Sequence, residues 1–178
     1  MNRPVPIIKK IFITLQQSYN GYKYPLDIER WIMEGNIKKT ERETIYIDIP
    51  QGADNNEIII LKNTGNVIND GNKGDIKVFI NITNDTIFKR DGIDFIIDKT
   101  ISLKEALCGF TFEIEHLNKK KFKINNDKGN VITPNFKKII PDLGMRRQNH
   151  TGNLIINFSV EFPKNLTIEQ IDKIQDIL

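Results

Sequence analysis

Apolar and polar residues alternate along most of this chain with the two-residue period of β-strands. In the first half, the alternation predicts strands at 7–14, 22–30, 44–49, 58–61 and 76–82. In the second half, it predicts strands at 95–99, 110–115, 121–124, 131–132, 138–140 and 154–162. Two polar stretches predict loops instead, because residues 36–43 are mostly charged and residues 65–74 are rich in Gly, Asn and Asp.

One short pattern occurs twice, as Thr14–Gly21 and Ser102–Gly109. Each copy begins with Ser or Thr and has Gln or Glu three residues later, which is the capping box of a helix start. Each copy closes on a glycine, which suits a helix end. Strand-like alternation flanks both copies. A strand–short helix–strand unit has therefore been used twice, which predicts two modules in tandem.

A third capping box, formed by Thr167 and Gln170, begins the clearest predicted helix, 166–178. An apolar stripe at helical spacing follows it, formed by Ile168, Ile171, Ile174 and Leu178. This stripe can pack within the chain or against a second copy. The prediction is a mainly β protein of two small β-sandwich-like modules, each with a short corner helix, and a C-terminal helix. The expected segments are 1–86, 87–165 and 166–178.

Composition excludes several classes of protein. The net charge of the 178 residues is only +3, whereas a dedicated nucleic-acid binder carries a larger, clustered excess. The single cysteine, Cys108, excludes an internal disulfide and a cysteine-based zinc site, and we expect it to be buried as a small apolar residue. No membrane span or signal peptide is evident, so a cytoplasmic protein that does not enter the membrane is expected.

The sequence lacks a catalytic constellation. Its two histidines, His116 and His150, have neither metal-ligand spacing nor a neighbouring nucleophile motif. Asp91, Asp94 and Asp98 are better interpreted as solvated residues around a turn at Gly92 than as a cation site. We therefore expect no enzyme activity, no metal and no cofactor.

Several short motifs in a fixed order resemble the C-terminal region of DnaJ-type (J-domain) co-chaperones. They are Ile87–Gly92, Leu103–Phe110, Gly144-Met145, Gly152–Leu154 and Phe162–Leu166. The resemblance extends over essentially the whole chain. The sequence contains no His-Pro-Asp tripeptide and no Cys-x-x-Cys-x-Gly-x-Gly repeats, so it is similar to the substrate-binding part of a zinc-free (class B) member.

The resemblance implies two peptide-binding domains and a homodimer held by the C-terminal helix stripe. It implies a shallow groove in the first module lined by Ile11, Leu26, Ile28 and Phe88, with Lys9 at a position where the family usually places an apolar residue. An extended client segment would add to a strand edge there. The alternative is that these four residues are simply the core of the module.

The implied partners are unfolded client polypeptides and an ATP-driven heat-shock chaperone of the DnaK class. Where class B members carry basic residues that hold the acidic tail of that chaperone, this chain has Tyr24, Pro25 and Asp27. Two other functions stay open at this point. One is binding of nucleic acid or an anionic partner through Lys119–Lys123 and Lys137-Lys138, and the other is a purely architectural dimer.

Overall fold

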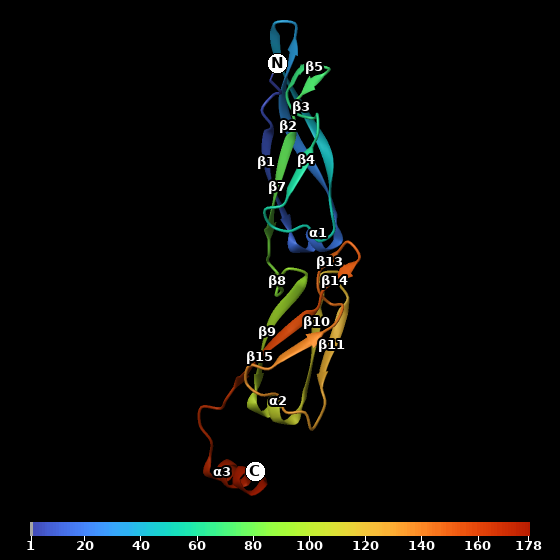
Figure 1. Cartoon of the computed structure of the whole chain (residues 1–178). Coiled ribbons are helices and arrows are strands. Elements are labelled where there is room, and N and C mark those ends of the chain that lie inside the picture. The colour runs from blue at the N-terminus through green and yellow to red at the C-terminus, as the bar shows by residue number, and fades with distance from the viewer. Residues whose placement is uncertain (1) are drawn as a thin grey trace. The chain divides into compact units, whose positions relative to one another are not determined.

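The computed structural model describes residues 2–178, and the fold is mainly β, as predicted (Figure 1). The chain divides into two compact units. The first contains the residues up to Phe88 together with Met145–Thr151, and the second contains Lys89–Gly144 and Gly152–Leu178. No helix among residues 2–178 has the length and apolar character needed to cross a membrane.

The first unit is built from two sheets and one short helix. The three-stranded sheet has the order β1 (Ile7–Thr14), β7 (Ile76–Thr83), β4 (Ile58–Leu61), with β1 and β7 parallel. The four-stranded sheet has the order β3 (Ile37–Ile49), β2 (Tyr22–Glu34), β5 (Val67–Asn69), β6 (Asn72–Lys73). The helix α1 (Leu15–Asn20) connects β1 to β2, and a small hairpin of β13 (Arg146–Arg147) and β14 (His150–Thr151) completes the unit.

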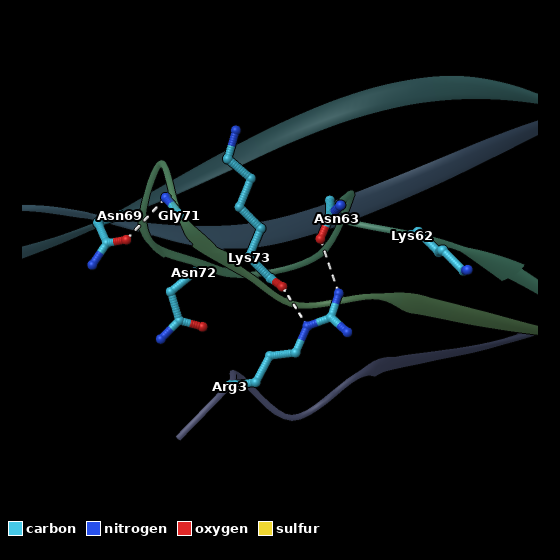
Figure 2. A pocket seen from close by; sticks show the side chains of 7 residues that line it. All are labelled: Arg3, Lys62, Asn63, Asn69, Gly71, Asn72 and Lys73. Carbon is cyan, nitrogen blue, oxygen red and sulfur yellow. Dashed lines mark hydrogen bonds between the residues drawn. The ribbon is translucent and has the colours of Figure 1, made fainter. Parts of the chain in front are cut away.

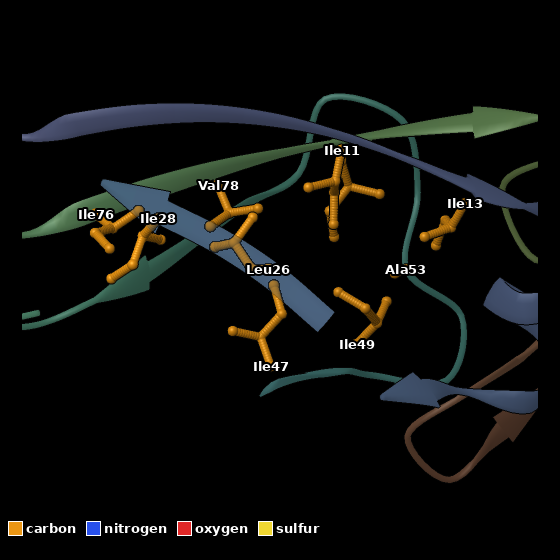
Figure 3. Packing of buried hydrophobic residues seen from close by; sticks show 10 residues of the cluster. Ile11, Ile13, Leu26, Ile28, Ile47, Ile49, Ala53, Ile76 and Val78 are labelled. Carbon is orange, nitrogen blue, oxygen red and sulfur yellow. The ribbon is translucent and has the colours of Figure 1, made fainter. Parts of the chain in front are cut away.

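The inward faces of these two sheets form one apolar core (Figure 3). Its members are Ile11, Ile13, Leu26, Ile28, Ile47, Ile49, Ala53, Ile76, Val78 and Ile80, and strand alternation places all of them except Ala53, which lies between β3 and β4. The branched aliphatic side chains suit a pleated, half-buried surface, and their removal from water stabilises the unit.

The second unit repeats the plan of the first. Its main sheet has the order β12 (Lys137–Ile140), β15 (Leu154–Glu161), β9 (Asp94–Ser102), β8 (Lys89–Asp91). A two-stranded sheet pairs β10 (Phe110–Glu115) with β11 (Lys121–Asn126), and the unit contains the helices α2 (Leu103–Cys108) and α3 (Ile168–Ile177). The parallel pair begins at Phe95↔Leu154 in this unit and at Ile7↔Ile76 in the first, which confirms the predicted repeat.

All three predicted capping boxes are present, at Thr14, Ser102 and Thr167. The glycines after the two short helices, Gly21 and Gly109, have φ of 76° and 93° with ψ of 152° and 162°. This combination is not the left-handed helical conformation expected from sequence but an extended region open essentially only to glycine. The two glycines therefore end each helix and turn the chain directly into the next strand.

The predicted loop at 36–43 is wrong, because these residues lie in β3. Strands β2 and β3 form an antiparallel hairpin that is paired from Tyr22↔Ile49 to Glu34↔Ile37. Its outer half has no apolar alternation, and its strands are joined by ion pairs such as Arg30–Glu41 (2.8 Å) and Arg42–Glu29 (2.6 Å). Opposite charges across a strand pair stabilise the pairing, which an analysis of apolar period alone does not detect.

Three smaller predictions also differ from the structure. Residues 65–74 contain the short strands β5 and β6, and residues 131–132 lie outside any strand. Cys108 is exposed, because the six-residue helix α2 buries only Ala106. The cysteine therefore lies on the exposed side of this helix.

Gly152 lies where two stretches of backbone meet. The backbone N–H of Gly144 donates a hydrogen bond to the carbonyl of Gly152 (2.8 Å). A Cβ atom built on Gly152 would lie 1.9 Å from the carbonyl oxygen of Ile93. Gly152→Ala is therefore expected to destabilise the chain by about 2 kcal/mol or more, which lowers Tm by several degrees. Gly71→Ala is the control for thermal denaturation, because the nearest atom to its Cβ is 3.6 Å away. Equal Tm values for the two variants would contradict this.

Candidate functional site

Strand β2 has one side without a partner strand. On one side it pairs with β3 along its whole length. On the other side, among residues 2–178, it pairs with β5 at Ile32↔Val67 and with no other strand. The loop before β5 also reaches this side, since Arg30 donates a hydrogen bond to the carbonyl of Thr64 (2.9 Å). The stretch from Lys23 to Glu29 is therefore an open strand edge.

The direction of the backbone groups on β2 follows from Pro25 and Trp31. Proline has no N–H, so the uninterrupted pairing opposite Tyr46 requires the nitrogen of Pro25 to face away from β3. The N–H of Trp31 also faces away, because it donates to the side-chain carbonyl of Asn66 (2.9 Å). Alternate residues of a strand share this direction, so the N–H groups of Asp27 and Glu29 point toward the open edge.

A hollow of about 410 Å³ adjoins this stretch of β2. It is lined by Lys9 of β1, by residues of β2 and by residues of β3, namely Asp27, Ile28, Glu29, Arg42, Glu43 and Thr44. Strand β1 is itself an edge strand, since it pairs only with β7 in its sheet. The hollow thus lies between two strands that each have an open side.

Charged groups around this hollow are largely paired with one another. Arg42 donates to Glu29 (2.6 Å), and the hydroxyl of Thr44 donates to Asp27 (2.5 Å). Glu43 accepts a hydrogen bond from Arg30 (2.8 Å). Lys9 enters the hollow from β1 and adds a further cation beside these carboxylates. The rim is polar and the floor, at Ile28, is apolar.

The structure brings three of the four predicted groove residues together in one core cluster, of which the fourth is not a member. Ile11, Leu26 and Ile28 belong to the apolar core, with exposed fractions of 2%, 4% and 2% (Figure 3). Phe88 is also buried, at the end of the first unit, but it is not a member of that core cluster. The side chains of all four are thus buried in the free chain, and their role in peptide binding stays a prediction.

The charged lining of the hollow was not predicted. Arg42 and Glu43 fell in the segment expected to be a loop, so no register linked them to Asp27 and Glu29. The signal in the sequence is the pair of unlike charges at facing positions, Arg30↔Glu41 and Glu29↔Arg42, which becomes informative only once the two strands are aligned.

The structure also places Tyr24, Pro25 and Asp27, at which the resemblance implied basic residues. Tyr24 packs against the core, Pro25 lies opposite Tyr46, and Asp27 accepts the hydrogen bond from Thr44. The nearby cation Arg30 is held by the carboxylates of Glu41 and Glu43. Its charge is compensated within the hairpin and is not presented to an acidic partner.

A second hollow, of about 670 Å³, lies at the far end of the first unit's three-stranded sheet and is polar (Figure 2). Its lining is basic and rich in amides, with Arg3, Lys62, Asn63, Asn69, Gly71, Asn72 and Lys73. Arg3 donates to the carbonyl of Lys73 (2.8 Å) and to the side chain of Asn63 (2.9 Å), and it forms an ion pair with Asp75 (2.6 Å). Lys62 is exposed at its rim.

The predicted C-terminal stripe lies on α3 and is exposed. None of the residues of α3 is buried, and Ile168 and Leu178 have exposed fractions of 79% and 91%. Ile174 lines a mainly apolar cavity of about 610 Å³ together with Leu103 and Leu107 of α2 and with Phe162. The helix is confirmed, whereas its role in dimerisation stays a prediction.

The lysines considered for anion binding face carboxylates. Lys119 forms an ion pair with Glu115 (3.3 Å), Lys121 forms one with Glu113 (3.5 Å), and Lys123 is paired across the strands with Glu113. Lys138 donates to the carbonyl of Asn125 (3.0 Å). Glu113 and Glu115 therefore offset part of the charge of the four lysines in this hairpin, which disfavours a nucleic-acid surface.

Within residues 2–178, no group of His, Cys, Asp and Glu is arranged to hold a metal ion. Asp94 accepts a hydrogen bond from the backbone N–H of Asn153 (2.7 Å). His116 is buried between Phe95 and Phe122, and its Nε2 donates to the carbonyl of Leu143 (3.0 Å). These groups have structural partners and contribute to packing.

Comparison with known proteins identifies one family. The profile of the family described as "DnaJ C terminal domain" matches residues 7–163. "Chaperone protein dnaJ 2" of Arabidopsis thaliana is 35% identical over 148 residues, which cover 82% of this chain and 35% of that protein. "DnaJ homolog dnj-20" of Caenorhabditis elegans is 37% identical over 148 residues, covering 80% of this chain and 41% of that protein. The chain spans well under half the length of these relatives.

Proposed function

This chain belongs to the DnaJ C-terminal domain family, and from that premise we propose that its first unit binds extended segments of unfolded polypeptide at the open edge of β2. The observation that carries the proposal is the stretch from Lys23 to Glu29, which has outward N–H groups and a hollow beside it. A client strand added there would gain backbone hydrogen bonds and place alternate side chains into the hollow.

The first unit is better suited to this role than the second. The first unit has Leu26 and Ile28 on the strand after its corner helix, where the second has Ile114 and His116. His116 is fixed by two aromatic rings and by the carbonyl of Leu143, so the equivalent place is already occupied. Client binding is therefore assigned mainly to the first unit.

We further propose that the exposed stripe of α3 joins two copies of the chain, and that the bound client is passed to a DnaK-class heat-shock chaperone. Two β2 edges in one dimer would hold a long client more tightly than one edge, because the second binding event becomes intramolecular. The compensated charge of Arg30 means that any docking of an acidic chaperone tail would use cations other than Arg30.

Amide hydrogen exchange tests the strand addition directly. In the free chain, the amides of Asp27 and Glu29 are expected to exchange quickly, because they face the open edge. The amide of Ile28 faces β3 and is expected to exchange slowly. A saturating extended apolar peptide should slow the exchange of Asp27 and Glu29 by at least about tenfold and leave Ile28 unchanged.

The pattern of protection separates this proposal from other modes of binding. If the peptide binds but Asp27 and Glu29 keep their fast exchange, the client does not add to β2. If no unfolded peptide binds at all, the chain is an architectural dimer rather than a client binder. The N–H of Trp31, already held by Asn66, is the internal control and should be protected in both states.

A further inference from the structure

The outer face of the first unit's three-stranded sheet is unusually apolar. Strand alternation directs the following residues outward: Ile8, Lys10 and Phe12 of β1, Lys77, Phe79 and Asn81 of β7, and Ile58 and Ile60 of β4. The exposed fractions of Ile8, Phe12, Ile58 and Ile60 are 60%, 58%, 49% and 51%. The pairing Lys10↔Phe79↔Ile58 places these side chains next to one another across the sheet.

The second unit shows that the fold does not need apolar residues at several of these positions, although it has Ile96, Ile155 and Ile139 where the first unit has Ile8, Lys77 and Ile60. The equivalent register of its own sheet puts Thr100 where the first unit has Phe12, and Asn157 where it has Phe79. In the same way, the second unit has Lys137 at the position of Ile58, and it has Asp98 at the position of Lys10.

The polar residues of the second unit's face are satisfied by one another. Thr100 and Ser159 are hydrogen-bonded through their hydroxyls (2.9 Å), and Asn157 donates to Asp98 (3.2 Å). Hydrogen bonds from Lys89 and Asn157 lower the pKa of Asp98. These positions are thus suited to contact with water, whereas the first unit has Phe12, Phe79 and Ile58 among theirs, and contiguous exposed apolar residues mark an interaction surface.

The charges on the first unit's outer face all have one sign. Lys10 and Lys77 point outward among the apolar side chains, and Lys62 follows directly after β4 and lines the basic hollow of Figure 2. The Nζ atom of Lys10 lies 5.7 Å from the centroid of the Phe12 ring. The carboxylate at the margin, Asp75, is already paired with Arg3.

We propose that this outer face is a docking surface for an acidic amphipathic segment, with apolar side chains that cover Phe12, Phe79 and Ile58 and carboxylates that reach Lys10, Lys77 and Lys62. Opposite charges favour such a partner and steer it to the face. A second copy of the chain is disfavoured as the occupant, because it would bring these lysines together. The surface is separate from the open edge of β2, so this inference does not depend on the proposed client binding.

A pair of synthetic amphipathic peptides of about 18 residues tests the proposal. One carries Leu on one face and Glu on the other, and its partner carries Lys in place of Glu. Binding to the whole chain is measured by fluorescence anisotropy. The Leu/Glu peptide is expected to bind at least about tenfold more tightly than the Leu/Lys peptide, and its affinity should fall as salt is raised.

The repeat itself supplies substitutions that the fold tolerates. The triple variant Phe12→Thr, Phe79→Asn, Ile58→Lys transfers the second unit's residues to the first and should weaken binding of the Leu/Glu peptide by at least about tenfold. Lys10→Asp should weaken it separately. Ile139→Thr, on the outer face of the second unit, is the control and should leave binding unchanged.

Three outcomes would overturn the proposal. The first is equal binding of the two peptides, and the second is unchanged binding of the Leu/Glu peptide by the triple variant. The third is a lower molar mass of the triple variant in light scattering, which would show that the face binds a second copy of the chain. The exchange of the Asp27 and Glu29 amides with a client peptide should be the same in the triple variant as in the unmodified chain. That readout separates a failure here from a failure of the proposed function.

Discussion

A chain that ends at Asn165 is expected to be a monomer, whereas the chain that includes α3 is expected to be a dimer. Every residue of α3 is at least partly exposed, and within the described part of one chain its apolar stripe is covered only in part, where Ile174 lies near Leu103, Leu107 and Phe162. Isolated helices of this length are marginal in water, so the helix needs a packing surface to be stable. The molar mass from light scattering should fall by half, and affinity for long clients should fall by about 10²–10⁴ through lost avidity.

Two single substitutions test whether the apolar stripe, and not merely the presence of the helix, is needed for dimerisation. Ile171→Glu places a carboxylate on the stripe and should also give a monomer, because a charge buried in an apolar interface is costly. Gln170→Glu adds the same charge one residue away and keeps the capping box with Thr167, so it should remain a dimer. If Ile171→Glu stays dimeric, or the truncated chain does, the contact between copies lies elsewhere.

The parts of the fold that could be predicted are those whose signal is local. Alternation located the strands around Ile11, Leu26 and Val78, because one face of each strand is buried in the same core. The capping boxes located all three helices, since both partners of each box lie within one turn. The repeat predicted the second unit's plan, because both copies keep the same parallel pair.

The parts that could not be predicted depend on pairing between distant segments. The arm of β2 and β3 beyond the core is held by charges such as Arg30 and Glu41, and their complementarity appears only when the two strands are in register. The hollow beside β2 was also missed, because three of its seven lining residues, Glu29, Arg42 and Glu43, come from the same arm. The hairpin from Met145 to Thr151 belongs to the first unit although it is encoded far along the chain.

Contacts of that hairpin illustrate why sequence alone missed it. Arg147 forms an ion pair with Glu57 and donates to the carbonyl of Gly52 (3.2 Å). The hydrogen bond to Glu57 raises the pKa of Arg147. The hairpin can approach Gly52 this closely because glycine has no Cβ atom. A Cβ at this position would lie 2.5 Å from the carbonyl oxygen of Arg146. None of these three residues belongs to a motif that would have linked them.

Replacing Ile28 with serine is expected to unfold the first unit rather than to weaken client binding selectively. Ile28 is 2% exposed and belongs to the core cluster. Loss of its buried methyl groups leaves a cavity, and the hydroxyl adds an unsatisfied polar group, for a cost of about 4 kcal/mol. Because the first unit has fewer than 100 residues, thermal denaturation should show its Tm lower by about 16–32 °C. Loss of aggregation suppression by this variant would therefore say nothing about a groove.

Two companion variants make the result decisive. Tyr46→Ser, at an exposed position on the neighbouring strand β3, should shift Tm by only a degree or two. Ile28→Val keeps the core at a cost of about 1 kcal/mol, so any effect on peptide affinity greater than about threefold would show that the side chain contacts the client. If Ile28→Ser instead melts like the unmodified chain, Ile28 is not needed for the core and its assignment to the groove becomes the better explanation. Amide hydrogen exchange at Asp27 and Glu29 needs no substitution, so it remains the independent measure of whether the client binds at the open edge of β2.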